Sequence, residues 1–253
     1  MPILPHGPGA DDPDRPARFA RDMDDATLIA IVQRQTLRYF WDFGHPVSGL
    51  ARDRSSIERP EGLDTCAVGG TGMGVMAILV GVERGWIARA EAASRLLVMT
   101  RFLLAADCWH GVFPHFLHGV TGRAIRFSRK DDAADLVETA YLIMGLLCAR
   151  RYFDGEDETE RALRRDVEQL WLEVEWSWHG RGDHNVLYWH WSPNHGWSVN
   201  FEIRGWNECL IVYVLAAASP TFGIDRRLYH KGWAAGPSFR NDREFHGVRL
   251  PLG

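Results

Sequence analysis

The sequence predicts an all-α protein built from pairs of helices, an arrangement that fits half of a helical toroid. Two observations support this fold class. Several segments carry apolar residues at helical spacing, and strands do not alternate regularly with helices. The linking segments are rich in aromatic residues and contain short alternating runs, so we expect small β-hairpins in the loops. The six expected helices cover residues 24–43, 71–83, 88–106, 132–153, 157–178 and a final segment that opens at 207.

The first helix should be amphipathic, because its apolar residues face one side and arginines the other. The next two helices are separated by only a few residues, so they should pack as an antiparallel pair. Four glycines, Gly69, Gly70, Gly72 and Gly74, come before or within the second helix. No strand precedes them and no Lys-Ser/Thr follows, which excludes a phosphate-binding loop. We interpret them as small residues at a tight helix start.

Three segments are expected to be irregular or to form short strands. Residues 109–127 alternate over a short stretch and indicate a small hairpin. Residues 186–191 are expected to form another short hairpin strand. Residues 232–253 are rich in glycine and proline, so we predict mostly loop there.

The last helix follows a loop rich in tryptophan. Asn207 suits the N-cap and Glu208 the first helical position, and the apolar residues behind them predict a buried helix. A carboxylate at the wet end of such a helix, below indole rings, is what a sugar-cleaving site needs. The alternative is that Glu208 only complements the positive end of the helix dipole.

Length and charge limit the possible functions. A chain of 253 residues with ordinary composition fits one globular domain, which we place at residues 25–253. A net charge of −4 argues against nucleic acid or an anionic membrane as the main partner, and no apolar run reaches the ~20 residues of a membrane span. Residues 1–24 are interpreted as a flexible leader without a secretory signal. The expected location is therefore cytoplasmic by default, or periplasmic if an upstream start is missing.

Two carboxylates on the fourth expected helix are candidates for acid/base chemistry. Asp135 and Glu138 are three residues apart, so their side chains share a face. Asp132 and Asp135 also have the spacing of an N-cap and its reciprocal partner, which offers a structural explanation for Asp135. Glu138 lies deeper among apolar residues, where burial and the charge of Asp135 should raise its pKa.

The tryptophans indicate a binding surface. The chain has 11 Trp, and four of them cluster just before Glu208. Any one of them is a good core residue, but their clustering in expected loops favours a surface on which sugar rings stack. The chain also has 11 His without metal-ligand spacing, so we expect no metal or other cofactor and assign the histidines to hydrogen bonding in a polar cleft. A Gly-x-Ser-x-Gly elbow is absent, which excludes the usual serine hydrolase.

Several long segments, in the same order, resemble the bacterial glucoamylase-like family, which includes endo-β-1,2-glucanases with an (α/α)6 barrel. These segments are YFWDFGHPVSGLARDRS, GGTGMGVMAI, HGVFPHFLHGVTG, FSRKDDAADLVETAYLIMGLL, LYWHWSPNHGW and IRGWNECLIVYVLAAASP. The resemblance extends from about residue 28 to the end of the chain. It implies an (α/α)6 toroid of which this chain holds about the first six helices, or half of the barrel.

The resemblance also implies a glycoside hydrolase that cleaves β-glucan, with β-1,2-glucan favoured, by inversion. The matching cleft acids are Asp135, Glu138 and Glu208, with Glu208 as the general acid. The opposing base is then expected in the half that this chain lacks. The candidate substrate-binding residues in these segments are Trp189, Trp191, Trp197, Trp206, His115, Phe113, Asn207 and Arg54.

Two other classes stay open at this stage. The chain could bind glucan through its tryptophan-rich loops without cleaving it. It could also be a helical interaction protein, although no internal repeat of 20 to 50 residues is visible. Half of a toroid should expose apolar helix faces, so we also expect self-association through these faces.

Overall fold

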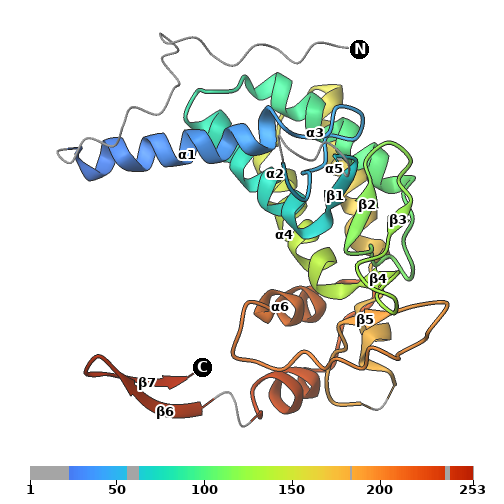
Figure 1. The fold of residues 1–253 in the computed structure, drawn as a ribbon. Coiled ribbons are helices and arrows are strands. Elements are labelled where there is room, and N and C mark those ends of the chain that lie inside the picture. Colours follow the sequence, from blue (N-terminus) through green and yellow to red (C-terminus); the bar gives the residue numbers. More distant parts are fainter. Residues whose placement is uncertain (1–22, 56–62, 183, 237–239, 253) are drawn as a thin grey trace.

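The computed structural model describes residues 23–55, 63–182, 184–236 and 240–252. Most of the expected leader, residues 1–22, lies outside these ranges. Helices dominate the described chain, which confirms the all-α prediction (Figure 1). None of the described helices has the length and apolar character needed to cross a membrane. The α-helices are α1 (Asp25–Trp41), α2 (Val68–Glu83), α3 (Arg89–Leu104), α4 (Leu136–Tyr152), α5 (Glu158–Glu173) and α6 (Leu210–Ala218).

Two shorter helices complete the helical part. The 3-10 helix η1 (Trp176–Gly180) follows α5, and the π-helix η2 (Leu228–Trp233) follows α6. The sequence prediction had merged η1 with α5 into one helix at 157–178. Residue 174 ends α5 instead, because Val174 has the extended backbone angles φ −71° and ψ 112°.

The centre of the molecule is the contact between α2 and α4, and α1, α5 and α6 pack around this pair. Glycines permit the close approach. A Cβ on Gly72 would collide with the backbone carbonyl of Tyr141, and a Cβ on Gly145 would collide with that of Gly72. Gly69 and Gly70 lie in the first turn of α2, as the sequence analysis expected, whereas Gly72 and Gly74 lie further along the helix and serve helix packing.

Short antiparallel strands fill the connections. The hairpin expected at 109–127 is confirmed as β2 (Phe116–His118) and β3 (Ala124–Ile125), with β1 (Thr65–Ala67) added as a third strand beside β2. The strand expected at 186–191 is β5 (His190–Trp191). It pairs with β4 (Ala134–Asp135), directly before α4, and Tyr188 of the same segment forms an antiparallel bridge with Glu202.

The prediction of loop at 232–253 is wrong. The last described residues form an antiparallel hairpin, β6 (Arg240–Phe245) and β7 (Val248–Leu252). His246 and Gly247 make its turn with φ of 51° and 76°, the left-handed conformation that two-residue hairpin loops require.

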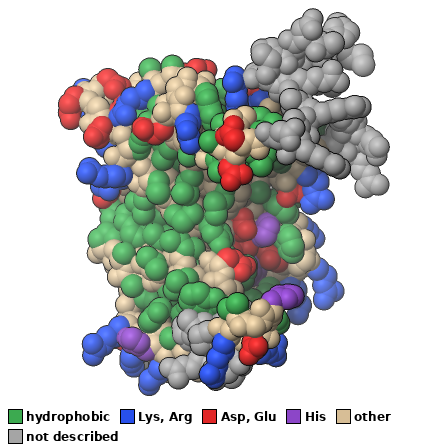
Figure 2. Space-filling view, turned by 90° about the vertical axis from the view of Figure 1, so that its left-hand side faces the viewer, with side chains coloured by type: hydrophobic (Ala, Val, Ile, Leu, Met, Phe, Trp, Pro, Cys, Tyr) green, Lys and Arg blue, Asp and Glu red, His purple; other side chains and the backbone are tan. Residues whose placement is uncertain are grey.

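One face of the molecule is broadly hydrophobic, beside a group of acidic and histidine side chains (Figure 2). Met73, Met76 and Val80 of α2 follow one another at helical spacing and are each more than a third exposed, as is Val214 of α6. The apolar helix faces expected for half of a toroid are therefore present. Two of the four thiols, Cys66 and Cys209, are buried, while Cys108 and Cys148 are exposed.

Candidate active site

The β4–β5 pair separates two groups of candidate residues. Asp135 lies opposite His190 in the register, and Ala134 lies opposite Trp191. Because successive strand residues point to opposite faces, the acids and histidines gather on one face of this pair and Trp191 points to the other.

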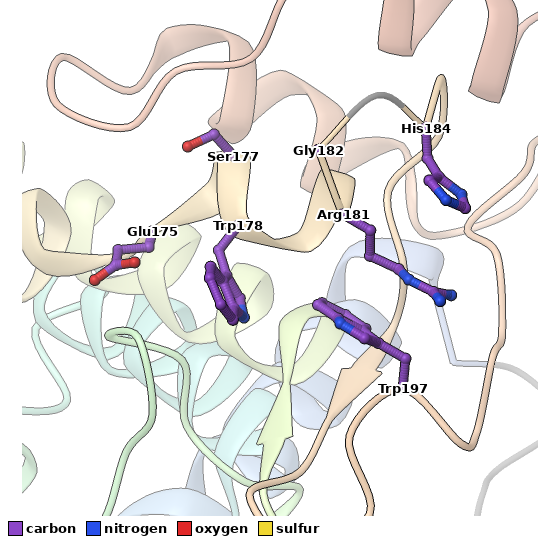
Figure 3. Close-up of a pocket in the computed structure, with 7 residues that line it drawn as sticks. All are labelled: Glu175, Ser177, Trp178, Arg181, Gly182, His184 and Trp197. Carbon is purple, nitrogen blue, oxygen red and sulfur yellow. The ribbon is translucent and has the colours of Figure 1, made fainter.

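The aromatic face holds a cavity of about 650 Å³ that includes Trp178, Arg181 and Trp197 in its lining (Figure 3). The Trp191 ring packs edge-on against the Trp178 ring, with 6.1 Å between centroids. The lining of this cavity contains none of the three predicted catalytic acids. This cavity and the predicted acids are thus different places, and the acids have the stronger chemical claim to catalysis because a cavity alone supplies no proton.

The other predicted aromatic residues are spread over several environments. Trp189 is partly buried and packs edge-on against Phe201, with 5.4 Å between ring centroids, whereas Trp206 is 51% exposed. Phe113 is 2% exposed and belongs to the hydrophobic core, so its prediction as a substrate-binding residue is wrong. Its alternation with polar neighbours in sequence resembled a loop surface, but its backbone bonds to Thr139 and Asp135 hold it under α4.

Arg54 also lies apart from the acids. Its side chain is 80% exposed and makes an ion pair with the neighbouring Asp53, at 2.6 Å between Nε and Oδ2. This contact gives no support to the predicted role of Arg54 in substrate binding.

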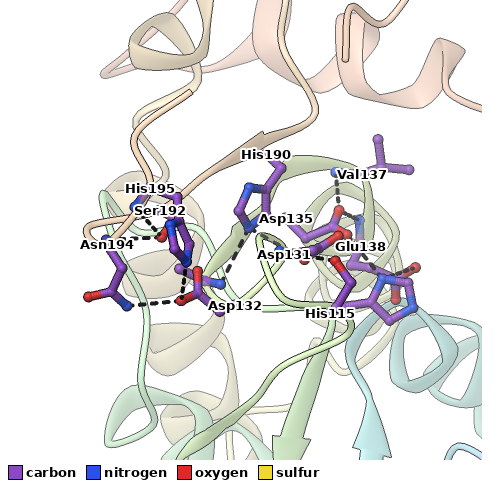
Figure 4. A network of polar contacts seen from close by, with 12 residues as sticks. His115, Asp131, Asp132, Asp135, Val137, Glu138, His190, Ser192, Asn194 and His195 are labelled. Carbon is purple, nitrogen blue, oxygen red and sulfur yellow. Dashed lines mark hydrogen bonds and ion pairs between the residues drawn. The ribbon is translucent and has the colours of Figure 1, made fainter. Parts of the chain in front are cut away.

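The acid face is built on the first turn of α4 (Figure 4). Asp135 is the N-cap, since its Oδ1 accepts hydrogen bonds from the backbone N–H groups of Val137 and Glu138, both at 3.0 Å. The prediction that α4 begins near Asp132 is therefore wrong. The chain is still in β4 at Asp135, which pairs with His190 and keeps residues 134–135 extended.

His115 joins the two predicted acids of α4. Its Nδ1 lies 3.1 Å from Oδ2 of Asp135 and 3.9 Å from Oε1 of Glu138. Burial alone would lower the pKa of His115, but the hydrogen bond to Asp135 and the charges of Glu138 and Asp135 outweigh burial and raise it. The imidazole consequently favours its charged form between two carboxylates, while Phe127 packs beside the ring at 4.4 Å between centroids.

Glu138 is held between α4 and α2. Its Oε2 accepts a hydrogen bond of 2.7 Å from the backbone N–H of Gly69, in the first turn of α2. Glycine at position 69 leaves room for this carboxylate, because a Cβ would lie 2.7 Å from the oxygen. Burial, followed by the charge of Asp135, raises the pKa of Glu138. This direction confirms the expectation from sequence and is the one that a proton donor near neutral pH requires.

Asp131 is part of the cluster, although sequence reasoning missed it. Burial, followed by the charge of Asp135, raises the pKa of Asp131 to about 6. Its buried Oδ1 lacks a hydrogen bond and lies 3.4 Å from Nε2 of His190. That nitrogen instead accepts from the backbone N–H of Ala133, and burial lowers the pKa of His190, so a neutral imidazole faces the carboxyl.

The neighbouring Asp132 behaves differently. It accepts a 2.9 Å hydrogen bond from Nδ2 of Asn194. Burial tends to raise its pKa, but hydrogen bonds from Ser192 and Asn194 prevail and lower it. The sequence signal that could have pointed to Asp131 is the pair Asp131-Asp132 before the helix. Asp132 binds the loop at 192–194, and Asp131 faces His190 instead.

Glu208 lies before α6, not in it. The prediction that Asn207 caps the helix and that Glu208 opens it is wrong, because Cys209 is the N-cap and Leu210 the first helical residue. The side chain of Asn207 is used for a local turn, in which its Oδ1 accepts from Cys209 N–H at 3.0 Å.

Glu208 is exposed, but it is anchored beside the acid face. The hydroxyl of Tyr141 donates a 3.0 Å hydrogen bond to the backbone carbonyl of Glu208. Tyr141 lies one turn after Glu138 on α4, and the nearby charges of Glu208 and Glu138 both add to the effect of burial in raising its pKa. The starts of α2, α4 and α6 therefore converge, with Gly69, Glu138 and Glu208 at or near their first turns. Within the described ranges, groups of three or more His, Cys, Asp or Glu suited to a metal ion are absent.

The fold of paired helices is similar to that of solved glucoamylase-like proteins. The family described as "Putative glucoamylase" matches residues 200–252. A solved structure with the same description, from Bacteroides uniformis, has 49% sequence identity and a TM-score of 0.88, covering 92% of this chain and 56% of that one.

Two relatives have more specific descriptions. The endo-β-1,2-glucanase of Chitinophaga pinensis, solved with sophorotriose and glucose, has 47% identity and a TM-score of 0.87, covering 91% of this chain and 56% of that one. An exo β-1,2-glucooligosaccharide sophorohydrolase of Parabacteroides distasonis is 43% identical over an alignment of 250 positions, and the match covers 91% of this chain and 34% of the relative. The resemblance to the glucoamylase-like family is confirmed. The chain spans about a third of the curated relative and about half of the solved chains.

Proposed function

We propose that this chain is the amino-terminal part of a glycoside hydrolase domain that cleaves β-1,2-glucan by an inverting acid/base mechanism. The observation that carries the proposal is the half-buried Glu138 with a raised pKa, bound to the start of α2 and facing His115. It is supported by the descriptions of two relatives, a β-1,2-glucanase and a sophorohydrolase, which match more than nine-tenths of this chain.

Inversion needs a carboxylic acid that protonates the glycosidic oxygen and a carboxylate, ~6.5 to 9.5 Å away, that activates water on the opposite face of the sugar. We assign the acid to Glu208, as the family resemblance implies. We place the base in the further helices that the longer relatives contain. These helices would also cover Glu208.

The other members of the cluster support this chemistry. Asp135 has no exposed surface and uses both oxygens, one for the cap of α4 and one for His115, so we propose that it orients His115. Glu138 is the competing candidate for the proton donor because its pKa is already raised. The proposed sugar-binding residues of this site are the predicted ones that keep exposed surface and lie outside the aromatic face: Trp189, Trp206, His115, Asn207 and Arg54. Trp191 and Trp197 also keep exposed surface but lie on the aromatic face.

The test is the rate of sugar release from β-1,2-glucan by the wild-type chain, Glu208→Gln and Glu138→Gln. Each assay is run alone and with the carboxy-terminal helices of the Chitinophaga pinensis relative added. Loss of a general acid should lower the rate by about 10²- to 10⁴-fold. Glu91→Gln, an exposed acid of α3, is the matched control and should keep the wild-type rate.

The outcomes separate the alternatives. A loss confined to Glu208→Gln assigns the proton donor to Glu208, and a loss confined to Glu138→Gln assigns it to Glu138. Full rates in both variants would contradict an acid role for either residue. Saccharide binding without release by any of these proteins would favour the alternative of a glucan-binding chain without catalysis.

We also propose that the open apolar face associates with a second copy of the chain. The stripe of Met73, Met76 and Val80 is exposed along α2, and such a continuous apolar surface is costly in water. Light scattering of the purified chain should give a mass above that of the 28.7 kDa protomer. A monomer at high protein concentration would contradict this proposal.

A further inference from the structure

The cavity on the aromatic face is formed by η1 and the loop that follows it. Figure 3 shows Trp178, Arg181 and Trp197 turned toward this space. Its volume, about 650 Å³, lies within the range of small-molecule sites, which is ~300 to 1,000 Å³. Since Trp191 points to this side and Asp135 to the other, the cavity opens away from the acid cluster.

The ring of Trp178 forms a rigid apolar surface. It is 40% exposed, yet one of its faces is covered by the His110 ring, which stacks on it at 4.0 Å between centroids and 16° between planes. His110 is fixed in turn by a 2.9 Å contact between its Nδ1 and Oε2 of Glu175. The indole is therefore held in place while its remaining surface stays in water, and an aromatic face of this kind suits the C–H face of a pyranose ring.

Trp197 supplies a second ring at an angle to the first. Its centroid lies 6.3 Å from that of Trp178, and the planes differ by 35°. It packs edge-on against the buried ring of His179, whose own Nδ1 bonds to the Tyr188 carbonyl at 2.8 Å. Burial lowers the pKa of His179 to about 4, so this support is a neutral ring at physiological pH.

Polar groups complete the cavity. The guanidinium of Arg181 lies over the rings of Tyr188, at 4.4 Å, and Trp197, at 5.2 Å, and donates a 2.7 Å hydrogen bond to Oδ1 of Asn200. A guanidinium has five N–H donors, so Arg181 keeps donors for hydroxyl groups of a ligand. The hydroxyl of Ser177 and the carboxylate of Glu175 line the same space. A carboxylate in the lining disfavours an anionic ligand and favours a neutral polyol.

We propose that this cavity is a second saccharide-binding site, which holds a neutral gluco-oligosaccharide without cleaving it. Two fixed indoles supply the apolar surface, and Arg181 and Ser177 supply hydrogen bonds to hydroxyl groups. Among the described lining residues the one carboxylate is Glu175, which is engaged by His110, and hydrolysis would need a pair of carboxyl groups. The choice of a β-1,2-linked glucose ligand rests on the proposed function, whereas the existence of the site does not.

The experiment is a titration of the full chain with sophorotriose, followed through the indole N–H signals of its tryptophans in ¹H–¹⁵N spectra. Trp→Phe variants assign the signals. We expect saturable shifts of the Trp178 and Trp197 signals. Trp178→Ala should weaken this binding at least tenfold, and Trp178→Phe, which keeps a ring, should weaken it less. Phe245→Ala removes a comparably exposed aromatic side chain from β6 and should change nothing.

Two comparisons make the result decisive. Arg181→Ala provides an independent loss of affinity if Trp178→Ala disturbs the fold, which the dispersion of the other indole signals would reveal. Glu208→Gln should leave the shifts intact, because Glu208 does not line this cavity. Sugar binding here by the wild-type chain without any hydrolysis would count against the proposed function alone. The second site is refuted if sophorotriose leaves both indole signals unmoved, or if Trp178→Ala and Arg181→Ala bind as tightly as the wild type.

Discussion

The two faces of the β4–β5 pair hold different chemistry on the same short ribbon. On the face of Asp135, the pKa values of His115, Asp131 and Glu138 are all raised. On the face of Trp191, rings stack on one another and the exposed surface of Trp178 is held rigid. On the first face, partly buried side chains hold their protons to a higher pH than they would in water. On the second face, recognition would depend on flat aromatic rings that carry no charge. A strand pair of only two residues per strand is therefore enough to direct Asp135 and Trp191 to opposite faces, one with titratable groups and the other with aromatic rings.

The largest effect on stability is expected from His115→Ala. This change removes the cationic partner of a fully buried carboxylate, Asp135, and leaves Glu138 without its neighbouring positive charge. Breaking a buried pair typically costs ~3 to 5 kcal/mol, and we expect about 3 kcal/mol because His115 is partly exposed. Urea unfolding at pH 6 measures it. A loss below about 1 kcal/mol would mean that the two faces differ less in electrostatics than we infer.

A smaller, pH-dependent effect is expected from Asp131→Asn. The folded protein holds the Asp131 proton up to about pH 6, above the ordinary value of 3.8, so this group contributes stability below pH 4 that disappears as the pH rises through 6. Asparagine stays neutral throughout. The stability of the variant relative to wild type should therefore rise by about 2 to 3 kcal/mol between pH 4 and pH 7.

The measurement is a set of unfolding curves for Asp131→Asn and wild type across this pH range. Asp132→Asn is the matched control, and because hydrogen bonds lower the pKa of Asp132, its relative stability should change in the opposite direction. An Asp131→Asn difference that stays constant with pH would show that this carboxyl titrates as it does in the unfolded chain.

The smallest effect on stability is expected from Trp178→Ala. The side chain is 40% exposed, and its removal mainly loses the contacts with His110 and Trp191. Aromatic contacts of this kind are worth ~0.5 to 1.5 kcal/mol each, so the loss should be about 1 to 2 kcal/mol. Thermal unfolding at constant pH tests it, and a much larger loss would assign the ring to the core.

The helices were accessible from sequence because the apolar period of 3.6 is a local property, and α1 and α3 lie within a few residues of their predicted bounds. The β4–β5 pairing was not accessible, since it joins Asp135 to His190 across more than fifty residues. That pairing moves the start of α4 and buries Asp131. The sequence analysis placed Glu208 inside the helix because it took Asn207 as the N-cap. In the structure the Asn207 side chain closes a turn onto Cys209 instead of capping a helix.

The residues of the candidate site show the same contrast between local and long-range contacts. Glu138 and its raised pKa followed from one acid among apolar neighbours, because both causes are close in sequence. The Gly69 N–H that binds Glu138 comes from another helix, and the core position of Phe113 depends on Thr139 above it. Such long-range contacts leave no periodic signal in the chain.

The most direct test of the account is a site-resolved titration of the Glu138 carboxyl by ¹³C spectroscopy. We predict that Glu138 of the wild-type chain titrates above its ordinary value of 4.5, and that Asp135→Asn moves this midpoint down because one source of the shift is removed. A Glu138 that titrates at or below 4.5 would leave the start of α4 without a carboxyl that holds its proton toward neutrality, and would contradict the proposed acid cluster.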